Sequence, residues 1–172
     1  NQSARASNLT GTTSRSNGSL NLEVDEATIA AGESYKVDFK SSDFANISGY
    51  QFTLKFDSKA LIFENIVEGA LKVTEGNFGT TNVNNGVITT SWNSNKGESF
   101  GKDEVLFSIV FKATKNAKVS ANLAITSDVT TAEAYDASLN LKDVRLGVRT
   151  DRGIVEGGVF ELYQNSPNPF AK

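Results

Sequence analysis

The residues of this chain best suited to metal chemistry are three acids in one short polar stretch, Asp128, Glu133 and Asp136. Calcium takes carboxylate oxygens from loops, so these residues are the calcium candidates. Their spacing matches no EF-hand loop, and acids on loops are usually just solvated, so the interpretation without a metal is favoured. Asp25 and Glu26 form a weaker pair of candidates.

The composition argues against catalysis. The sequence contains no histidine and no cysteine, which excludes the commonest general base, the thiol nucleophiles and disulfides. No Gly-x-Ser-x-Gly motif activates a serine. Two carboxylates can hydrolyse a glycosidic bond without a motif, but no pattern supports such a pair here. We therefore predict that the chain is not an enzyme and has no cofactor, with calcium as the one candidate.

A tryptophan and two tyrosines, Trp92, Tyr50 and Tyr35, could form an aromatic platform for a sugar ring. A polysaccharide would then be the partner, and the chain would be the carbohydrate-binding module of a secreted polysaccharide-degrading enzyme. However, Tyr50 continues the apolar side of a strand, and Trp92 shares its side with Ile88. Packing in a core is therefore favoured, and carbohydrate binding is the alternative function.

The strongest structural pattern is residues 49–57, where large apolar and polar side chains alternate without a break. A period of two predicts a half-buried, central strand of an antiparallel sheet. Its polar side could bind a protein partner, although a solvated sheet face is the favoured interpretation. The apolar side chains are Tyr50, Phe52, Leu54 and Phe56, and the polar ones are Gln51, Thr53 and Lys55.

Further strands follow at short intervals, separated by polar turns. Apolar residues on both sides of 104–112 predict a second central strand, and the run 60–67 predicts a buried strand. Asn85-Gly86 predicts a type I′ hairpin turn before a strand at 87–92. About nine strands in total predict an all-β sandwich, a jelly roll. The other predicted strands are 20–24, 35–39, 119–125 and 139–148, and the predicted loops include 93–101 and 127–137, the latter with a single helical turn.

The 172 residues suit one domain with tails. We expect a flexible Ser/Thr/Asn-rich arm at 1–19, a sandwich at 20–149, a Gly-rich linker at 150–158 and a distinct tail at 159–172. A net charge of −3 gives no reason to bind nucleic acid, and no apolar run is long enough to span a membrane.

The strand pattern resembles that of cohesin domains. In that family, Gly-aromatic-Gln-Phe-x-Leu-x-aromatic-Asp precedes a leucine-containing strand and a glycine, matched here by residues 49–57, Leu61 and Gly69. A later Asp-Gly-Val-Leu-Phe-x-Ile-x-Phe element is similar to residues 103–111, with Glu104 in place of the glycine. The resemblance implies a nine-stranded jelly roll that binds a protein, in cohesins a dockerin helix pair.

The tail resembles the start of a type A C-terminal sorting domain of the type IX secretion system. This resemblance implies recognition by the secretion machinery, export across a bacterial outer membrane, and a secreted or cell-surface location. The hallmark Phe-x-Leu-x-Gln-Asn-x-Pro-Asn-Pro-Phe is matched by Phe160, Leu162, Gln164, Asn165, Pro167, Asn168, Pro169 and Phe170.

Residues 160–163 also alternate around Glu161, which predicts a strand that could add to an exposed sheet edge of the same or a neighbouring molecule. The expected function is that of a non-catalytic bacterial surface or secreted module, acting in adhesion, protein–protein interaction or extracellular assembly.

Overall fold

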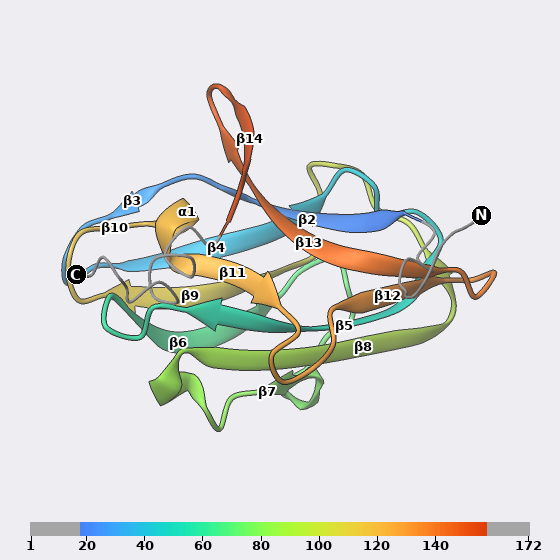
Figure 1. Ribbon diagram of the computed structural model, residues 1–172, viewed down its shortest axis with the longest axis horizontal. Helices are drawn as coiled ribbons and strands as arrows, with labels where there is room; N and C mark the ends of the chain where they lie inside the picture. Colours follow the sequence, from blue (N-terminus) through green and yellow to red (C-terminus); the bar gives the residue numbers. More distant parts are fainter. Residues whose placement is uncertain (1–17, 158–172) are drawn as a thin grey trace, which may run out of the picture.

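The computed structural model describes residues 18–157, and their strands form one long sheet that curls into two facing layers (Figure 1). The sheet order is β6-β9-β4-β2-β13-β12-β5-β8-β7, with β11 also paired to β5 and β14 to β13. This observation confirms the predicted all-β sandwich. The front layer, nearest the viewer in Figure 1, contains β5 (Ile47–Phe56), β7 (Phe78–Gly79), β8 (Val87–Glu98), β11 (Leu123–Thr126) and β12 (Glu133–Asp136).

The back layer is made of three strands, and two long strands join it to the front layer. The back strands are β4 (Ser34–Ser41), β6 (Leu61–Glu68) and β9 (Phe107–Ala113), and the joining strands are β2 (Ser19–Asp25) and β13 (Leu141–Thr150). A separate two-stranded ribbon contains β3 (Thr28–Ile29) and β10 (Ala117–Lys118). The first and last long strands, β2 and β13, pair in parallel from Ser19↔Asp143 to Asp25↔Arg149, whereas the other pairs are antiparallel.

The core lies between the layers, and aromatic contacts connect them. The ring of Phe56 on β5 lies 5.0 Å from that of Phe111 on β9, and Phe78 on β7 lies 5.4 Å from Phe107. The apolar side of β5 is buried along its whole length, as its alternation predicted. Both β5 and β9 have a neighbour on each side, so the two predicted central strands are confirmed.

Two predictions about strand position need correction. The run 60–67 was predicted to be a buried strand, but within residues 18–157 β6 pairs only with β9, and it exposes much of its surface, including Ile62 at 49%. Its apolar residues therefore belong to an edge strand. Residues 93–98, predicted as a loop, continue β8, although the pairing with β5 shifts between Ile47↔Glu98 and Gly49↔Asn93.

The local backbone conformation overturned two other predictions. The Asn85-Gly86 turn is not type I′, because only Gly86 has positive φ, at the end of the short 3₁₀ helix η2 (Val83–Asn85). A second 3₁₀ helix, η1 (Glu75–Asn77), precedes β7. The predicted strand 119–125 begins instead as α1 (Val119–Asn122), where Asn122 Nδ2 donates to the carbonyl of Lys118 at 2.7 Å.

The segments predicted as a loop and a linker contain strands. β12 forms within the expected loop 127–137 because it pairs with β5 on one side and β13 on the other. β14 (Gly153–Glu156) forms within the expected linker 150–158 and makes a hairpin with β13. Both segments are rich in polar residues, so their structure comes from pairing and not from apolar alternation.

The predicted tail at 159–172 and residues 1–17 of the predicted arm lie outside the described residues, and Ser19 already belongs to β2. Among residues 18–157, no helix is long and apolar enough to cross a membrane.

Candidate functional site

The candidate site is the solvent side of the front layer, called here the outer face, where β12, β5 and β8 lie side by side. Cross-strand pairing places Gln51 between Glu133 and Ser91, and the next row places Gly49 between Tyr135 and Asn93. Residues on one side of a strand alternate with those on the other, so Gln51 points away from the core that Tyr50 and Phe52 enter. The outer face is therefore built from β12, β5 and β8 together.

Thr53 lies on the outer side of β5 but is fully buried, with 0% exposure. Its hydroxyl accepts hydrogen bonds from the backbone N–H groups of Val129 at 3.1 Å and Thr130 at 2.8 Å, and it donates to the carbonyl of Thr130 at 2.9 Å. Thr53 thus anchors the connection between β11 and β12 to the sheet. This connection covers Thr53, so a partner at this place would contact residues 127–132 and not Thr53 itself.

Of the two other predicted binding residues, Lys55 reaches the same connection, and Gln51 reaches Glu133, the first residue of β12. Lys55 Nζ lies 3.1 Å from Asp128 Oδ2 in an ion pair, and Gln51 Nε2 donates to Glu133 Oε2 at 3.4 Å. Both side chains are half-buried. The predicted residues Gln51, Thr53 and Lys55 therefore do lie together. Thr53 holds the β11–β12 connection from beneath, and Lys55 and Gln51 contact its two ends.

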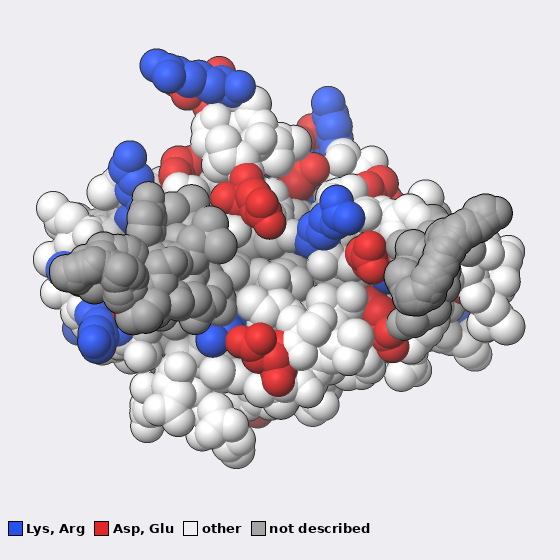
Figure 2. Space-filling model, in the orientation of Figure 1, with Lys and Arg blue, Asp and Glu red and all other residues white. Residues whose placement is uncertain are grey.

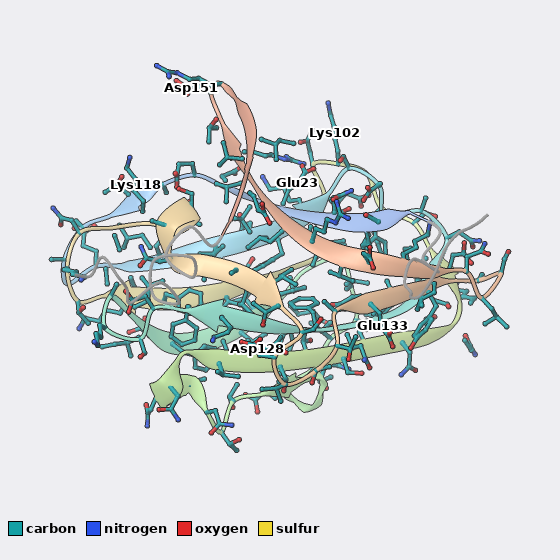
Figure 3. The ribbon with its side chains drawn as sticks, in the orientation of Figure 1. Glu23, Lys102, Lys118, Asp128, Glu133 and Asp151 are labelled. Atoms are coloured by element: carbon teal, nitrogen blue, oxygen red, sulfur yellow. The ribbon has the colours of Figure 1, made fainter. Side chains whose placement is uncertain are left out.

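The three predicted calcium ligands are used separately. In Figure 3, Asp128 and Glu133 lie at different places along the front layer. Asp136 accepts bonds from the backbone N–H groups of Ser138 and Asn140, both at 2.9 Å, and from Asn140 Nδ2 at 2.9 Å. The bond from the Asn140 side chain is the main cause that lowers the Asp136 pKa.

Within residues 18–157, no group of three or more His, Cys, Asp or Glu side chains is arranged to hold a metal ion. The calcium hypothesis is therefore not supported for Asp128, Glu133 and Asp136.

Tyr135 is the large exposed side chain of the outer face, with 37% exposure. Its ring covers Gly49, because a Cβ at Gly49 would lie 3.6 Å from Tyr135 Cδ2. Its hydroxyl donates to Glu133 Oε2 at 2.8 Å, and this hydrogen bond is the main cause that raises the Tyr135 pKa. The bond fixes an aromatic ring whose edge can contact another molecule.

The predicted aromatic platform for a sugar does not exist on this face. Trp92 is 5% exposed and Tyr50 is 2% exposed, and their rings stack in the core with centroids 5.4 Å apart. Tyr35 lies on β4 in the back layer, opposite Phe111. The favoured interpretation of Trp92 and Tyr50 as core residues is confirmed, and the carbohydrate hypothesis loses the residues on which it rested.

Charged and uncharged groups share this face. Figure 2 shows acidic atoms over the middle of the front layer among uncharged ones, and Figure 3 labels Asp128 there and Glu133 farther along the layer. The exposed residues of β8 are Ser91, Asn93, Asn95 and Lys96. At the Asn93 end, a cavity of about 460 Å³ lies between Trp92, Leu71 and Phe100. A sheet face that presents polar groups and one exposed aromatic ring suits contact with a protein surface.

Sequence reasoning missed Tyr135, Ser91 and Asn93 as members of this face. Ser91 and Asn93 alternate with buried Thr90 and Trp92, so the period of two could have placed them outside. Tyr135 lies in a segment without such a pattern, and only its pairing with Gly49 places it here.

Comparison with known proteins gives one family and a set of similar folds. The family model of the cohesin domain matches residues 20–154. The sixth cohesin of scaffoldin B from Acetivibrio cellulolyticus, solved in complex with a mutant Cel5 dockerin, has 21% identity and a TM-score of 0.53, covering 74% of this chain and 94% of that chain.

Two other solved structures show the same fold at low identity. The cohesin of a Clostridium thermocellum Coh-OlpC-Doc435 complex has 16% identity and a TM-score of 0.56, covering 79% of this chain and 94% of that chain. A non-cellulosomal cohesin from the archaeon Archaeoglobus fulgidus has 16% identity and a TM-score of 0.52, covering 76% of this chain and 86% of that chain. No curated protein matched.

Proposed function

This chain belongs to the cohesin family, and on that premise we propose that its outer face binds a helical, dockerin-type domain of another protein. Cohesin domains are non-catalytic modules for protein–protein interaction, and this chain is accordingly not an enzyme. The similar cohesins from Acetivibrio cellulolyticus and Clostridium thermocellum were solved in dockerin complexes, which supports the choice of partner.

The observation that carries the proposal is the outer face itself, a paired sheet that presents polar side chains and one exposed aromatic ring. Gln51, Ser91 and Asn93 offer polar groups that need little desolvation, and Tyr135 offers an amphipathic ring held by Glu133. Tyrosine is enriched among residues that dominate binding energy at interfaces. A pair of helices could lie across this face, with Tyr135 as the main contact.

The binding test is a quantitative titration. The chain is used as bait for surface proteins of its source cell, and a captured protein with a helical dockerin-type domain is then purified and titrated by calorimetry. Ser91→Arg inserts a long charged side chain at the centre of the face and should weaken binding at least about tenfold. Asn65→Arg, at an exposed position of β6 in the back layer, is the matched control and should bind as the parent does.

If Ser91→Arg binds as tightly as the parent, the outer face is not the binding surface. Capture of no dockerin-bearing protein would remove the proposed partner class.

We also propose that the protein is exported by a type IX-like system and acts at the cell surface or outside the cell, in adhesion or extracellular assembly. The support is the sequence pattern of residues 160–170, and cohesins are typically extracellular or surface modules.

The double substitution Pro167→Ala with Pro169→Ala in the full natural polypeptide should keep the protein inside a bacterium that has this system. Ser166→Ala, at a variable position of the pattern, is the control that should be exported normally. Equal export of both variants would contradict the proposal.

A further inference from the structure

The hairpin of β13 and β14 extends away from the sandwich and carries an uncovered strand. In Figure 1 it rises above β2 and β4, and Figure 3 places Asp151 at its tip. All four residues of β14 are exposed, including Ile154 at 59% and Val155 at 44%. Among the described residues, β14 pairs only with β13, so its other edge is open.

The open edge of β14 lacks the features that usually protect an edge strand. Natural edge strands are protected by proline, by lysine or by a β-bulge. Residues 153–156 read Gly-Ile-Val-Glu, and they pair with β13 without a shift in register. An exposed edge with two consecutive apolar residues favours the addition of a further strand.

The hydrogen-bond pattern shows which backbone groups face the open edge. The N–H of Gly157 donates to the carbonyl of Leu146 at 3.2 Å, so Gly157 directs its backbone groups toward β13. Successive residues of a strand direct these groups to opposite sides. Ile154 and Glu156 stand at odd distances from Gly157 or from its bonded equivalents along β14, and so direct their N–H and C=O groups away from β13.

Two charged side chains of the hairpin have no counter-charge nearby. Arg152 and Glu156 are exposed, and neither makes an ion pair or a side-chain hydrogen bond within residues 18–157. They are four positions apart, which is about 13 Å in an extended chain, so they do not pair with each other. A second strand on the open edge can supply the missing counter-charges.

We propose that the open edge of β14 binds β14 of a second copy of this chain, antiparallel about a two-fold axis at Ile154. In this register the outward N–H and C=O groups of Ile154 bond to those of Ile154 in the other copy. Each Arg152 lies opposite Glu156 of the other copy, and opposite charges at directly opposed positions stabilise a strand pair. The surface is thus complementary to itself, as a two-fold interface requires.

Neighbouring positions of the axis fit less well. An axis at Glu156 places two carboxylates directly opposite each other, which destabilises the pair. An axis at Val155 places each Glu156 against the apolar Ile154. The axis at Ile154 pairs the charges, and it also covers the exposed Ile154 side chain with its equivalent in the second copy.

The dimer keeps the outer face of both copies accessible. In Figure 1 the hairpin rises at the top of the molecule, whereas β7 and β8 lie at the bottom. Two copies joined at β14 therefore present two outer faces. Where these faces bind a partner as proposed above, the dimer binds a protein with two matching domains more tightly than one copy does.

Charge reversal tests the register. Arg152→Glu or Glu156→Arg alone places like charges opposite each other twice, and each should weaken the dimer at least about tenfold, measured by sedimentation equilibrium of the full chain. The double variant restores opposite charges between copies and should recover the parent Kd to within about threefold. Because these two residues do not meet within one molecule, the recovery requires two copies.

The matched control for charge is Lys72→Glu, which changes the net charge as much as Arg152→Glu does. Lys72 is exposed and borders the cavity beside Trp92, so it does not belong to the hairpin. This variant should dimerise as the parent does. Weakening equal to that of Arg152→Glu would mean that net charge, and not the pairing of Arg152 with Glu156, controls the association, and would overturn the proposal.

Ile154→Pro tests the use of the edge. Proline removes the outward N–H and blocks strand addition, whereas the bonds between β14 and β13 remain because Ile154 directs its groups away from β13. This variant should be monomeric. In the parent, hydrogen exchange at the amides of Ile154 and Glu156 should slow as the protein concentration rises.

Four results would overturn the proposal. The parent stays monomeric at millimolar concentration, or the double charge variant stays as weak as the single ones. Ile154→Pro dimerises with the parent Kd, which places the contact elsewhere. The amides of Ile154 and Glu156 exchange slowly at every concentration, which shows that the edge is covered within one molecule.

Discussion

The two sides of β5 stabilise different parts of the molecule. The core side places Tyr50, Phe52 and Phe56 in contact with β8 and β9, and so connects the two layers. The outer side holds the connection between β11 and β12 through Thr53 and Lys55. The core side determines the stability of the whole sandwich, whereas the outer side determines the shape of one surface. Substitutions on the core side should therefore change the free energy of unfolding of the whole domain, whereas substitutions on the outer side should mainly change hydrogen exchange near the β11–β12 connection.

The largest expected effect comes from the core side. Phe52→Ala removes a side chain that is 1% exposed and leaves a cavity between the layers. The free energy of unfolding should fall by about 3–5 kcal/mol, measured by urea denaturation. A loss below about 1 kcal/mol would mean that β5 is not central to the core.

Thr53→Val should have the next largest effect, and that effect should be local. It keeps the side-chain volume but leaves the N–H groups of Val129 and Thr130 without their acceptor. The cost is about 1–3 kcal/mol, and hydrogen exchange should accelerate in residues 127–132. Thr53→Ser retains the hydroxyl and should keep the slow exchange. Equal exchange in both variants would show that the hydroxyl does not fix the connection.

Unlike the two substitutions above, Tyr50→Phe should raise the free energy of unfolding. The hydroxyl of Tyr50 is buried without a hydrogen-bond partner, so its removal should stabilise the protein by about 1 kcal/mol at neutral pH. Burial also raises the pKa of Tyr50 above its usual value of 10.0. Above pH 10 the unfolded chain ionises this tyrosine while the folded chain keeps it neutral, so stability falls as the pH rises.

The advantage of Tyr50→Phe over the parent should consequently grow between pH 10 and 11, as followed by thermal denaturation at each pH. A constant difference across this range would contradict the link to Tyr50.

The smallest effect is expected for Lys55→Ala. The ion pair with Asp128 is partly exposed, and such pairs contribute about 0.2–1 kcal/mol. The loss should shrink when the salt concentration is raised to 1 M, because exposed charges are screened. An effect as large as that of Thr53→Val would mean that the outer side depends on charge more than on the buried hydroxyl.

Strands whose apolar and polar residues alternate could be predicted from the sequence, because the alternation shows which side is buried. Strands that form only because neighbouring strands supply hydrogen bonds were missed. β5 and β9 carry large apolar residues at a period of two, so their central positions were predictable. β12 reads Glu-Ala-Tyr-Asp, which predicts no strand, and it forms because β5 and β13 supply hydrogen bonds on both sides.

The same limit applied to the candidate site. Gln51, Thr53 and Lys55 were found by alternation on one strand, but the burial of Thr53 depends on residues about 77 positions later in the chain. Tyr135 reaches the face only through its pairing with Gly49. Contacts between distant segments are not visible in a local pattern, and the outer face is made of such contacts.

The parallel pairing of β2 with β13 has a mechanical consequence for a module held by its two ends. Tension applied at residue 18 and at residue 157 pulls these neighbouring strands in opposite directions along their length, so the bonds from Ser19↔Asp143 to Asp25↔Arg149 carry the load together. The β13–β14 hairpin lies in the path of the force and opens first, one bonded pair at a time. The hairpin would thus lengthen under weak force, while the sandwich would rupture only under strong force.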